Sequence, residues 1–254
     1  MTQEISFEDY LAGGGKLSSP ANANSRYRGE IMRLMAVFVD SEMAGASGFA
    51  DVINLAPGLK ERMIAARMVL EKFSHAERVL KLMQEFGANT DRYINQHPWA
   101  SRQPRESNLG RQRLSGDMRL NVFHYPISDW CDAVTLNTLM GAATVIQLTE
   151  LKHCSYQPLA DVMHGIVAVE SSHARLGGSG LRILMESGFD KAAAQASVDY
   201  WSPRVAATFG NRESERQDLF KRFALRQNSN ATLLDQWQTE MQELLSNIGL
   251  EFKL

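Results

Sequence analysis

The residues with the clearest chemical meaning are a glutamate and a histidine three positions apart, in Glu170-Ser171-Ser172-His173. Residues at this spacing lie on one face of a helix, so both side chains can reach a single point in a helical bundle. Di-iron carboxylate bundles use two such Glu-x-x-His pairs, together with one acid from each of two further helices. One pair alone is a weak signal, because the same spacing arises by chance on solvated helices.

Three earlier segments supply most of the remaining ligand types. Glu42 lies among small residues in the first long helical segment, His75 lies in the second, and Asp132 opens the third. In chain order this gives an acid, a histidine, an acid and the Glu-x-x-His pair on four successive helices. Carboxylates and imidazoles both suit iron, so the set predicts an iron site, holding two ions or one, in the bundle interior.

One position departs from this pattern. Three residues before His75, where a second pair needs an acid, stands Lys72. A protonated lysine is a poor metal ligand, but its ammonium could replace a metal charge by pairing with Glu42, Asp132 and Glu170. The neighbouring Glu71 can also share the face of His75, so it is the alternative ligand if the register differs. We therefore assign Lys72 and Glu71 to the catalytic positions, with metal binding dependent on Lys72.

Each candidate also has a purely structural interpretation. Glu42 could be a surface acid on an amphipathic helix, and His75 could be a core histidine bonded to a neighbouring helix. Lys72 could run along the surface with its charge in water, and Asp132 could cap its helix. Arginines concentrated in residues 100–119 could be solvated, or could bind CoA phosphates or a partner subunit. These are Arg102, Arg105, Arg111, Arg113 and Arg119.

The elements that would position these residues are helices. Apolar residues recur with helical spacing over residues 26–49, 59–86, 128–150 and 158–176, and further helices are expected at 190–209 and 213–248. Residues 88–125 predict a long irregular connection, with a short strand candidate at 120–125, and the glycines of residues 177–180 predict a helix end or kink. We predict an all-α protein, a four-helix bundle with additional C-terminal helices. Residues 1–22 would form a flexible N-terminal segment, and residues 23–254 a single helical domain.

Composition narrows the class of protein. The chain has 254 residues, a formal net charge of −2 and only two cysteines. Near-neutral charge argues against nucleic-acid binding, and so few cysteines argue against a disulfide framework. The first residues lack the basic and apolar regions of a signal peptide, and no apolar run is long enough to cross a membrane. We therefore expect a cytoplasmic protein.

The Glu-x-x-His pair lies within a longer segment, residues 130–175, that resembles the phenylacetic acid catabolic protein family, in particular its catalytic, ring-epoxidising subunits. Weaker similarity covers residues 26–87. The motifs that carry the resemblance are Trp130-x-Asp132, Gly141-Ala142-Ala143, Cys154-Ser155-Tyr156-x-Pro158 and Glu170-Ser171-x-His173.

The resemblance implies a ferritin-like fold, a di-iron centre and oxygen insertion into the ring of an aromatic acyl-CoA. It also implies a second ferritin-like subunit and an NADPH-dependent reductase as partners, and a homo-oligomer is an alternative assembly. The sixth ligand would be an acid in the family, and here it is Lys72. Two hypotheses follow: an oxygenase subunit, or a ferritin-like subunit with a degenerate metal site that serves as a structural partner. The ligands implied by the resemblance are Glu42, His75, Asp132, Glu170 and His173.

Overall fold

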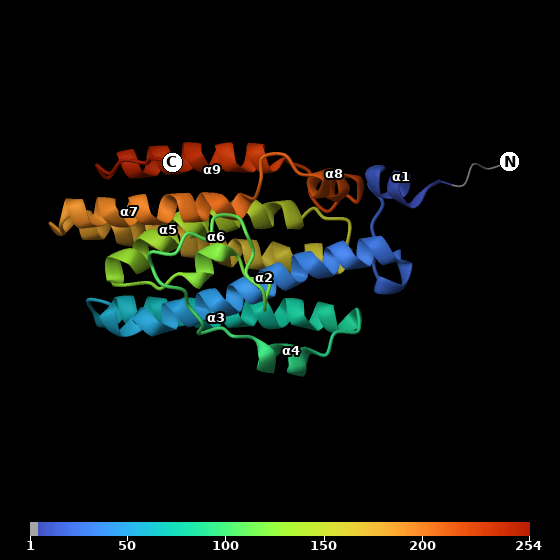
Figure 1. The fold of residues 1–254 in the computed structure, drawn as a ribbon, viewed down its shortest axis with the longest axis horizontal. Coiled ribbons are helices and arrows are strands. Elements are labelled where there is room, and N and C mark those ends of the chain that lie inside the picture. The colour runs from blue at the N-terminus through green and yellow to red at the C-terminus, as the bar shows by residue number, and fades with distance from the viewer. Residues whose placement is uncertain (1–4) are drawn as a thin grey trace.

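A computed structural model describes residues 5–254, in which helices are joined by loops (Figure 1). It holds no β-strand, only one isolated parallel bridge between Leu17 and Tyr156. The predicted all-α class is confirmed. The α-helices of residues 5–254 are α1 (Phe7–Ala12), α2 (Ser25–Val52), α3 (Leu59–Glu85), α4 (Thr90–Gln96), α5 (Trp130–Leu151), α6 (Gln157–Glu186), α7 (Lys191–Ala206), α8 (Glu215–Arg222) and α9 (Asn230–Ser246). Short 3₁₀ helices are η1 (Pro20–Asn22), η2 (Ile53–Leu55), η3 (Asn121–His124) and η4 (Ala207–Phe209).

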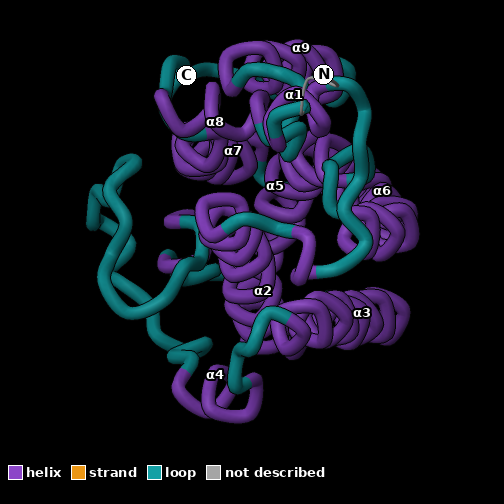
Figure 2. Tube along the Cα trace, turned by 90° about the vertical axis from the view of Figure 1, so that its right-hand side faces the viewer, coloured by secondary structure: helices purple, strands orange, loops and turns teal. Residues whose placement is uncertain are grey.

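The bundle is built from α2, α3, α5 and α6, which are seen nearly end-on in Figure 2. The closest pairs are α2 with α3 and α5 with α6. Helices α7 and α9 lie along the outside of α5, and the short helices α1 and α8 meet at one end (Figure 1). The result is a ferritin-like bundle with additional C-terminal helices, as predicted. None of the helices described is at once long enough and apolar enough to cross a bilayer.

Capping residues explain where the long helices begin and end. Asn24 accepts a hydrogen bond from the Tyr27 N–H at the start of α2, and Asp129 does the same for Asp132 in α5. Pro158 lies in the first turn of α6, where its missing N–H costs nothing. Helix α3 ends just before Gly87, which adopts the positive φ of +94° that glycine tolerates.

The prediction of a helix end at residues 177–180 was wrong. Helix α6 runs through these glycines to Glu186. A Cβ atom on Gly177 would lie 2.8 Å from the backbone nitrogen of Thr138 and 2.9 Å from the carbonyl carbon of Asn137, both in α5. The glycine is therefore required for the close approach of α5 and α6, not for a break in the chain.

Two further predictions were wrong. Residues 120–125 form no strand but contain η3. The expected helix at 213–248 is two helices, because Ala224 leaves the helical conformation with φ +48° and the chain then turns. The carboxylate of Glu150 stabilises this turn by accepting hydrogen bonds from the N–H groups of Gln227 and Asn228.

From residue 5 onward, the start of the chain is packed against the bundle. Leu11 and Leu17 are buried in the core, and the Lys16 ammonium donates to the carbonyl oxygens of His153 and Cys154. Residues 1–4 of the predicted flexible segment 1–22 lie outside the described residues. The division into a segment 1–22 and a single domain 23–254 stays a prediction.

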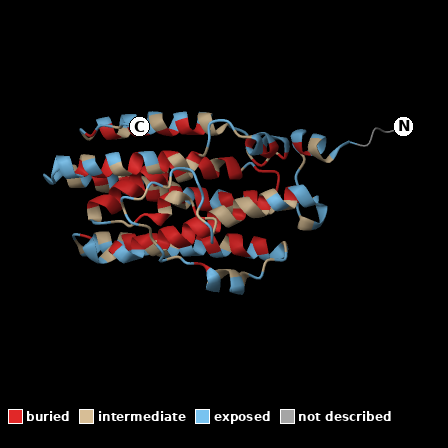
Figure 3. Ribbon diagram, viewed as in Figure 1, coloured by how far each residue is buried: buried red, intermediate tan, exposed pale blue. Residues whose placement is uncertain are grey.

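Burial follows the inward faces of the long helices (Figure 3). Most of the buried positions are apolar, but several are charged, and these lie in all four bundle helices and in the long connection between α4 and α5. Because a buried charge is stable only when it is paired, the partners of these residues show what the interior can do.

Candidate metal centre

Four of the predicted site residues meet in the middle of the bundle. Glu42 comes from α2, Lys72 and His75 from α3, and Glu170 from α6. All four are buried, with residue exposures of 4%, 7%, 3% and 0% in that order. One ligand atom each from Glu42, His75 and Glu170 lies within 4.8 Å of the others, a spacing that could hold a cation.

A cation of the protein itself already lies between the two carboxylates. Lys72 Nζ is 3.3 Å from Glu42 Oε1 and 3.1 Å from both carboxylate oxygens of Glu170. Burial acts to lower the pKa of Lys72, but attraction to the two carboxylates outweighs it and raises the pKa above its usual value. Lys72 is therefore charged, and it is not on the surface.

His75 supplies a second positive charge to the same carboxylates. Its Nδ1 lies 3.0 Å from Glu170 Oε1 and 3.3 Å from Glu42 Oε2. Burial opposes protonation, yet these hydrogen bonds outweigh it and raise the pKa of His75 to about 9. The pKa of Glu170 moves in the opposite direction, well below its usual value, because attraction to Lys72 outweighs the effect of burial. Two carboxylates thus face two cations in a neutral group.

His173 and Glu71 form a separate contact beside this group. His173 Nε2 lies 2.6 Å from Glu71 Oε2, while its Nδ1 is 3.4 Å from Glu170 Oε1. The rings of His173 and His75 have their centroids 6.2 Å apart. Glu71 therefore reaches the site through His173 and not through His75.

Asp132 does not join the other predicted ligands. Its carboxylate is bound by the guanidinium of Arg105 and by the Ser197 hydroxyl at 2.6 Å, and it also accepts from the Ser128 N–H. Burial acts to raise the pKa of Asp132, but these hydrogen bonds outweigh it and hold the pKa below its usual value. Asp132 fastens the first turn of α5 to α7 and to the irregular connection. The expected meeting of Asp132 with Glu42 and Glu170 is therefore not found.

Helix α5 brings no acid to the group around Glu42. Its residues lining the cavity beside Glu42 include Met140, Thr144 and Gln147, and its other buried acid, Glu150, binds the turn before α9. Di-iron carboxylate bundles take one acid from each of two helices and a Glu-x-x-His pair from each of the other two. With Lys72 bound to both carboxylates and Asp132 bound elsewhere, the side chains as placed do not fit two metal ions.

Three of the arginines of residues 100–119 form contacts that hold the long connection in place. Arg119 is 1% exposed and forms a bidentate pair with Asp117. Arg102 donates to the carbonyl of Ala44 in α2, and Arg105 binds Asp132. A solvated loop is thus the wrong description for these three arginines, since they attach the long connection to the bundle.

A cavity of about 260 Å³ extends from the surface to Glu42. Arg33 lines it together with the exposed Arg113 and Arg216, and Phe38 and Phe123 add aromatic surface. Such a lining would suit a ligand with an apolar body and a negative charge.

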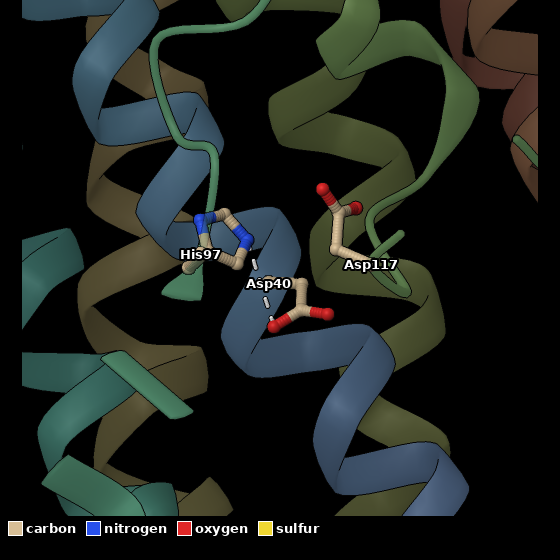
Figure 4. A group of neighbouring side chains, drawn as sticks. All are labelled: Asp40, His97 and Asp117. Carbon is tan, nitrogen blue, oxygen red and sulfur yellow. Dashed lines mark ion pairs between the residues drawn. The ribbon is translucent and has the colours of Figure 1, made fainter. Parts of the chain in front are cut away.

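The structure also shows a group that the sequence did not reveal. Asp40, His97 and Asp117 lie together on another side of α2 (Figure 4). They come from a helix, the end of another helix and an irregular segment, so no spacing in the sequence connects them. Likewise, no spacing in the sequence connects Asp132 with its partners Arg105 and Ser197.

Comparison with known proteins identifies a family. A family profile described as Phenylacetic acid catabolic protein matches residues 15–253, almost the whole chain. No curated protein sequence matches the chain.

Proposed function

Because the chain belongs to the phenylacetic acid catabolic protein family, we propose that it is the non-catalytic, ferritin-like subunit of a phenylacetyl-CoA oxygenase complex. Members of the family form part of such a multicomponent complex. In this proposal the bundle is a stable partner for a catalytic subunit, and its own interior site holds no iron.

The observation that carries the proposal is the position of the Lys72 ammonium. It lies within 3.3 Å of Glu42 and 3.1 Å of Glu170, and those two carboxylates are the acids that an iron ion would need. A metal ion could bind there only by displacing a buried, paired charge. Breaking a buried ion pair typically costs about 3 to 5 kcal/mol, and the displaced ammonium would then repel the incoming cation.

Exposed apolar residues support a role in assembly. Leu59, Met63 and Leu70 are 74%, 61% and 70% exposed, and their spacing places them on one face of α3. Exposed apolar surface of this kind is typical of protein interfaces. We assign this face to contact with the catalytic ferritin-like subunit.

Co-expression with a catalytic subunit of the same family tests the assembly. The wild-type chain should co-purify with that subunit, and a variant with Met63→Glu and Leu70→Glu should not, while remaining folded by circular dichroism. The matched control, Lys60→Glu and Glu77→Lys, changes charge on the same helix without removing apolar surface. If the apolar variant assembles like the wild type, this face is not the interface.

A second candidate function is the oxygenase itself, acting on an aromatic acyl-CoA with iron and an NADPH-dependent reductase. The arginine-lined cavity that ends at Glu42 favours this candidate, because it could take an acidic, aromatic ligand. Iron-loaded protein supplied with reductase, NADPH and phenylacetyl-CoA should consume no substrate if the chain is non-catalytic. Turnover that is lost in Glu170→Gln would instead establish the oxygenase.

A further inference from the structure

Outside the group around Lys72, we propose that Asp40, His97 and Asp117 form a binding site for one divalent transition-metal ion of the zinc type. The ion would fasten the long connection between α4 and α5 to helix α2. The site uses none of the residues placed around Lys72, so a test of this site does not depend on the proposed function.

The first support is geometric. One ligand atom from each residue lies within 4.8 Å of the others, and Asp40 and His97 are buried at 2% and 6% exposure (Figure 4). Zinc binds nitrogen and oxygen ligands at about 2.0 to 2.2 Å in a tetrahedral arrangement, so ligand atoms on one ion are about 3.4 Å apart. Asp40 Oδ1 and His97 Nε2, at 3.6 Å, are already close to this spacing.

The second support is the unsatisfied state of His97. Neither ring nitrogen of His97 has a hydrogen-bond partner among the described residues. Its Nε2 lies 3.6 Å from Asp40 Oδ1, which is too long for a hydrogen bond. A buried imidazole without partners is costly, and a metal ion on one nitrogen would remove part of that cost.

The protonation state of His97 agrees with this role. Burial, and then repulsion from the nearby Arg119, lower the pKa of His97 to about 4. The ring is therefore neutral at physiological pH, with a free lone pair on one nitrogen. Neutral imidazole is the form that binds metal ions.

The two carboxylates are held in place by outer hydrogen bonds. Asp40 accepts from the Tyr93 hydroxyl and from the Met118 N–H, both at 2.6 Å. Asp117 accepts from the guanidinium of Arg119 at 2.7 to 3.1 Å. Asp117 also accepts from the Arg119 backbone N–H at 2.9 Å, whereas each oxygen of Asp40 accepts one hydrogen bond and keeps a second lone pair. Carboxylates that bind metals are commonly hydrogen-bonded in this way.

The surrounding charges set the class of ion. Arg119 faces the site directly, Arg113 lies near enough to interact with Asp40 and Asp117, and the buried His124 lies near enough to interact with His97. This positive surrounding weakens binding of any cation that relies on charge alone, such as Mg²⁺ or Ca²⁺. An ion that forms a strong bond to imidazole nitrogen, such as Zn²⁺ or Co²⁺, is favoured instead.

Zinc binding to the purified full-length chain tests the site. We expect one Zn²⁺ per chain after equilibrium dialysis with Zn²⁺, and a Tm that rises with Zn²⁺ concentration, because the ion binds only the folded state. His97→Gln and Asp117→Asn should each weaken binding at least about 100-fold, since loss of an outer partner alone costs 10- to 100-fold. Co²⁺ should give visible absorption bands in the wild type that are lost in His97→Gln.

The matched controls use the other histidines. His164 lies with its ring centroid 6.3 Å from that of His153, and this pair could bind zinc adventitiously. His164→Gln should leave zinc binding unchanged, and so should Glu42→Gln in the other group. The proposal is overturned if the wild type binds no zinc, or if His97→Gln binds it as tightly as the wild type.

Discussion

Two groups of acids and histidines lie on different sides of the same helix. Asp40 and Glu42 are two residues apart in α2, so their side chains point about 200° apart around the helix axis. The group at Glu42 contains Lys72, whose ammonium lies between the carboxylates. In the group at Asp40 the Arg119 guanidinium pairs with Asp117 alone, and the histidine, His97, has no hydrogen-bond partner among residues 5–254.

The difference shows why acids and histidines alone do not define a metal site. Around Glu42, two carboxylates are balanced by two protonated side chains of the protein, so the group is complete without a metal ion. Around Asp40, the histidine is neutral and unsatisfied, so the group gains a partner when a metal ion binds. The group that resembles a di-iron site by sequence is thus the one less suited to metal, and the other has no sequence signature.

The largest expected effect comes from removing the cation of the first group. Lys72→Met leaves Glu42 and Glu170 facing only His75, so we expect a loss of about 3 to 5 kcal/mol in the free energy of unfolding. Urea denaturation followed by circular dichroism measures it. Lys81→Met on the same helix is the control, because Lys81 pairs with Glu77 in solvent and should contribute about 0.5 kcal/mol or less. Equal stability of the two variants would contradict the pairing of Lys72.

A smaller effect should appear as pH dependence. The pKa of His75 is raised from 6.5 to about 9 in the folded protein, so its contribution to stability is complete below pH 6.5. That contribution is lost as the pH rises through about 9, and we expect a decline of roughly 2 to 3 kcal/mol over this range. His75→Gln should flatten the decline, whereas His164→Gln should not. A wild-type profile that stays flat or rises between pH 6.5 and 9 would show that His75 is not held protonated.

The smallest effect distinguishes Asp132 from the acids of the Lys72 group. Asp132→Asn weakens the bonds to Arg105 and Ser197, and we expect it to cost about 1 to 2 kcal/mol in the free energy of unfolding. Ser197→Ala should lower stability in the same direction by a smaller amount, measured in the same urea titrations. Neither variant should change metal content. If Asp132→Asn lowers iron or zinc content, Asp132 belongs to a metal site after all.

Much of the fold could be predicted from the sequence because helical spacing and helix caps are local. The apolar pattern predicted the long helices and placed Glu42, His75 and Glu170 on them, and the caps Asn24 and Asp129 are seen in the structure. The continuation of α6 through Gly177 could not be predicted, because the reason lies in α5. A glycine that permits close approach and a glycine that ends a helix look the same in one sequence.

The errors at the site have a similar origin. Arg105, which binds Asp132, comes from an irregular segment, and Ser197 comes from a helix outside the four of the bundle. His97 and Asp117 come from the same long connection. Irregular segments have no periodicity that relates a side chain to a face, so their contacts can be found only from the structure.

The central claim is that the Lys72 ammonium takes the place of metal in the bundle interior. The most direct test is the iron content per chain after anaerobic loading with Fe(II), measured in the His97→Gln background so that the group at Asp40 does not contribute. We predict no bound iron with Lys72 present, and bound iron, with a raised Tm, once Lys72→Glu is added. One or two iron ions per chain in the presence of Lys72 would contradict the claim.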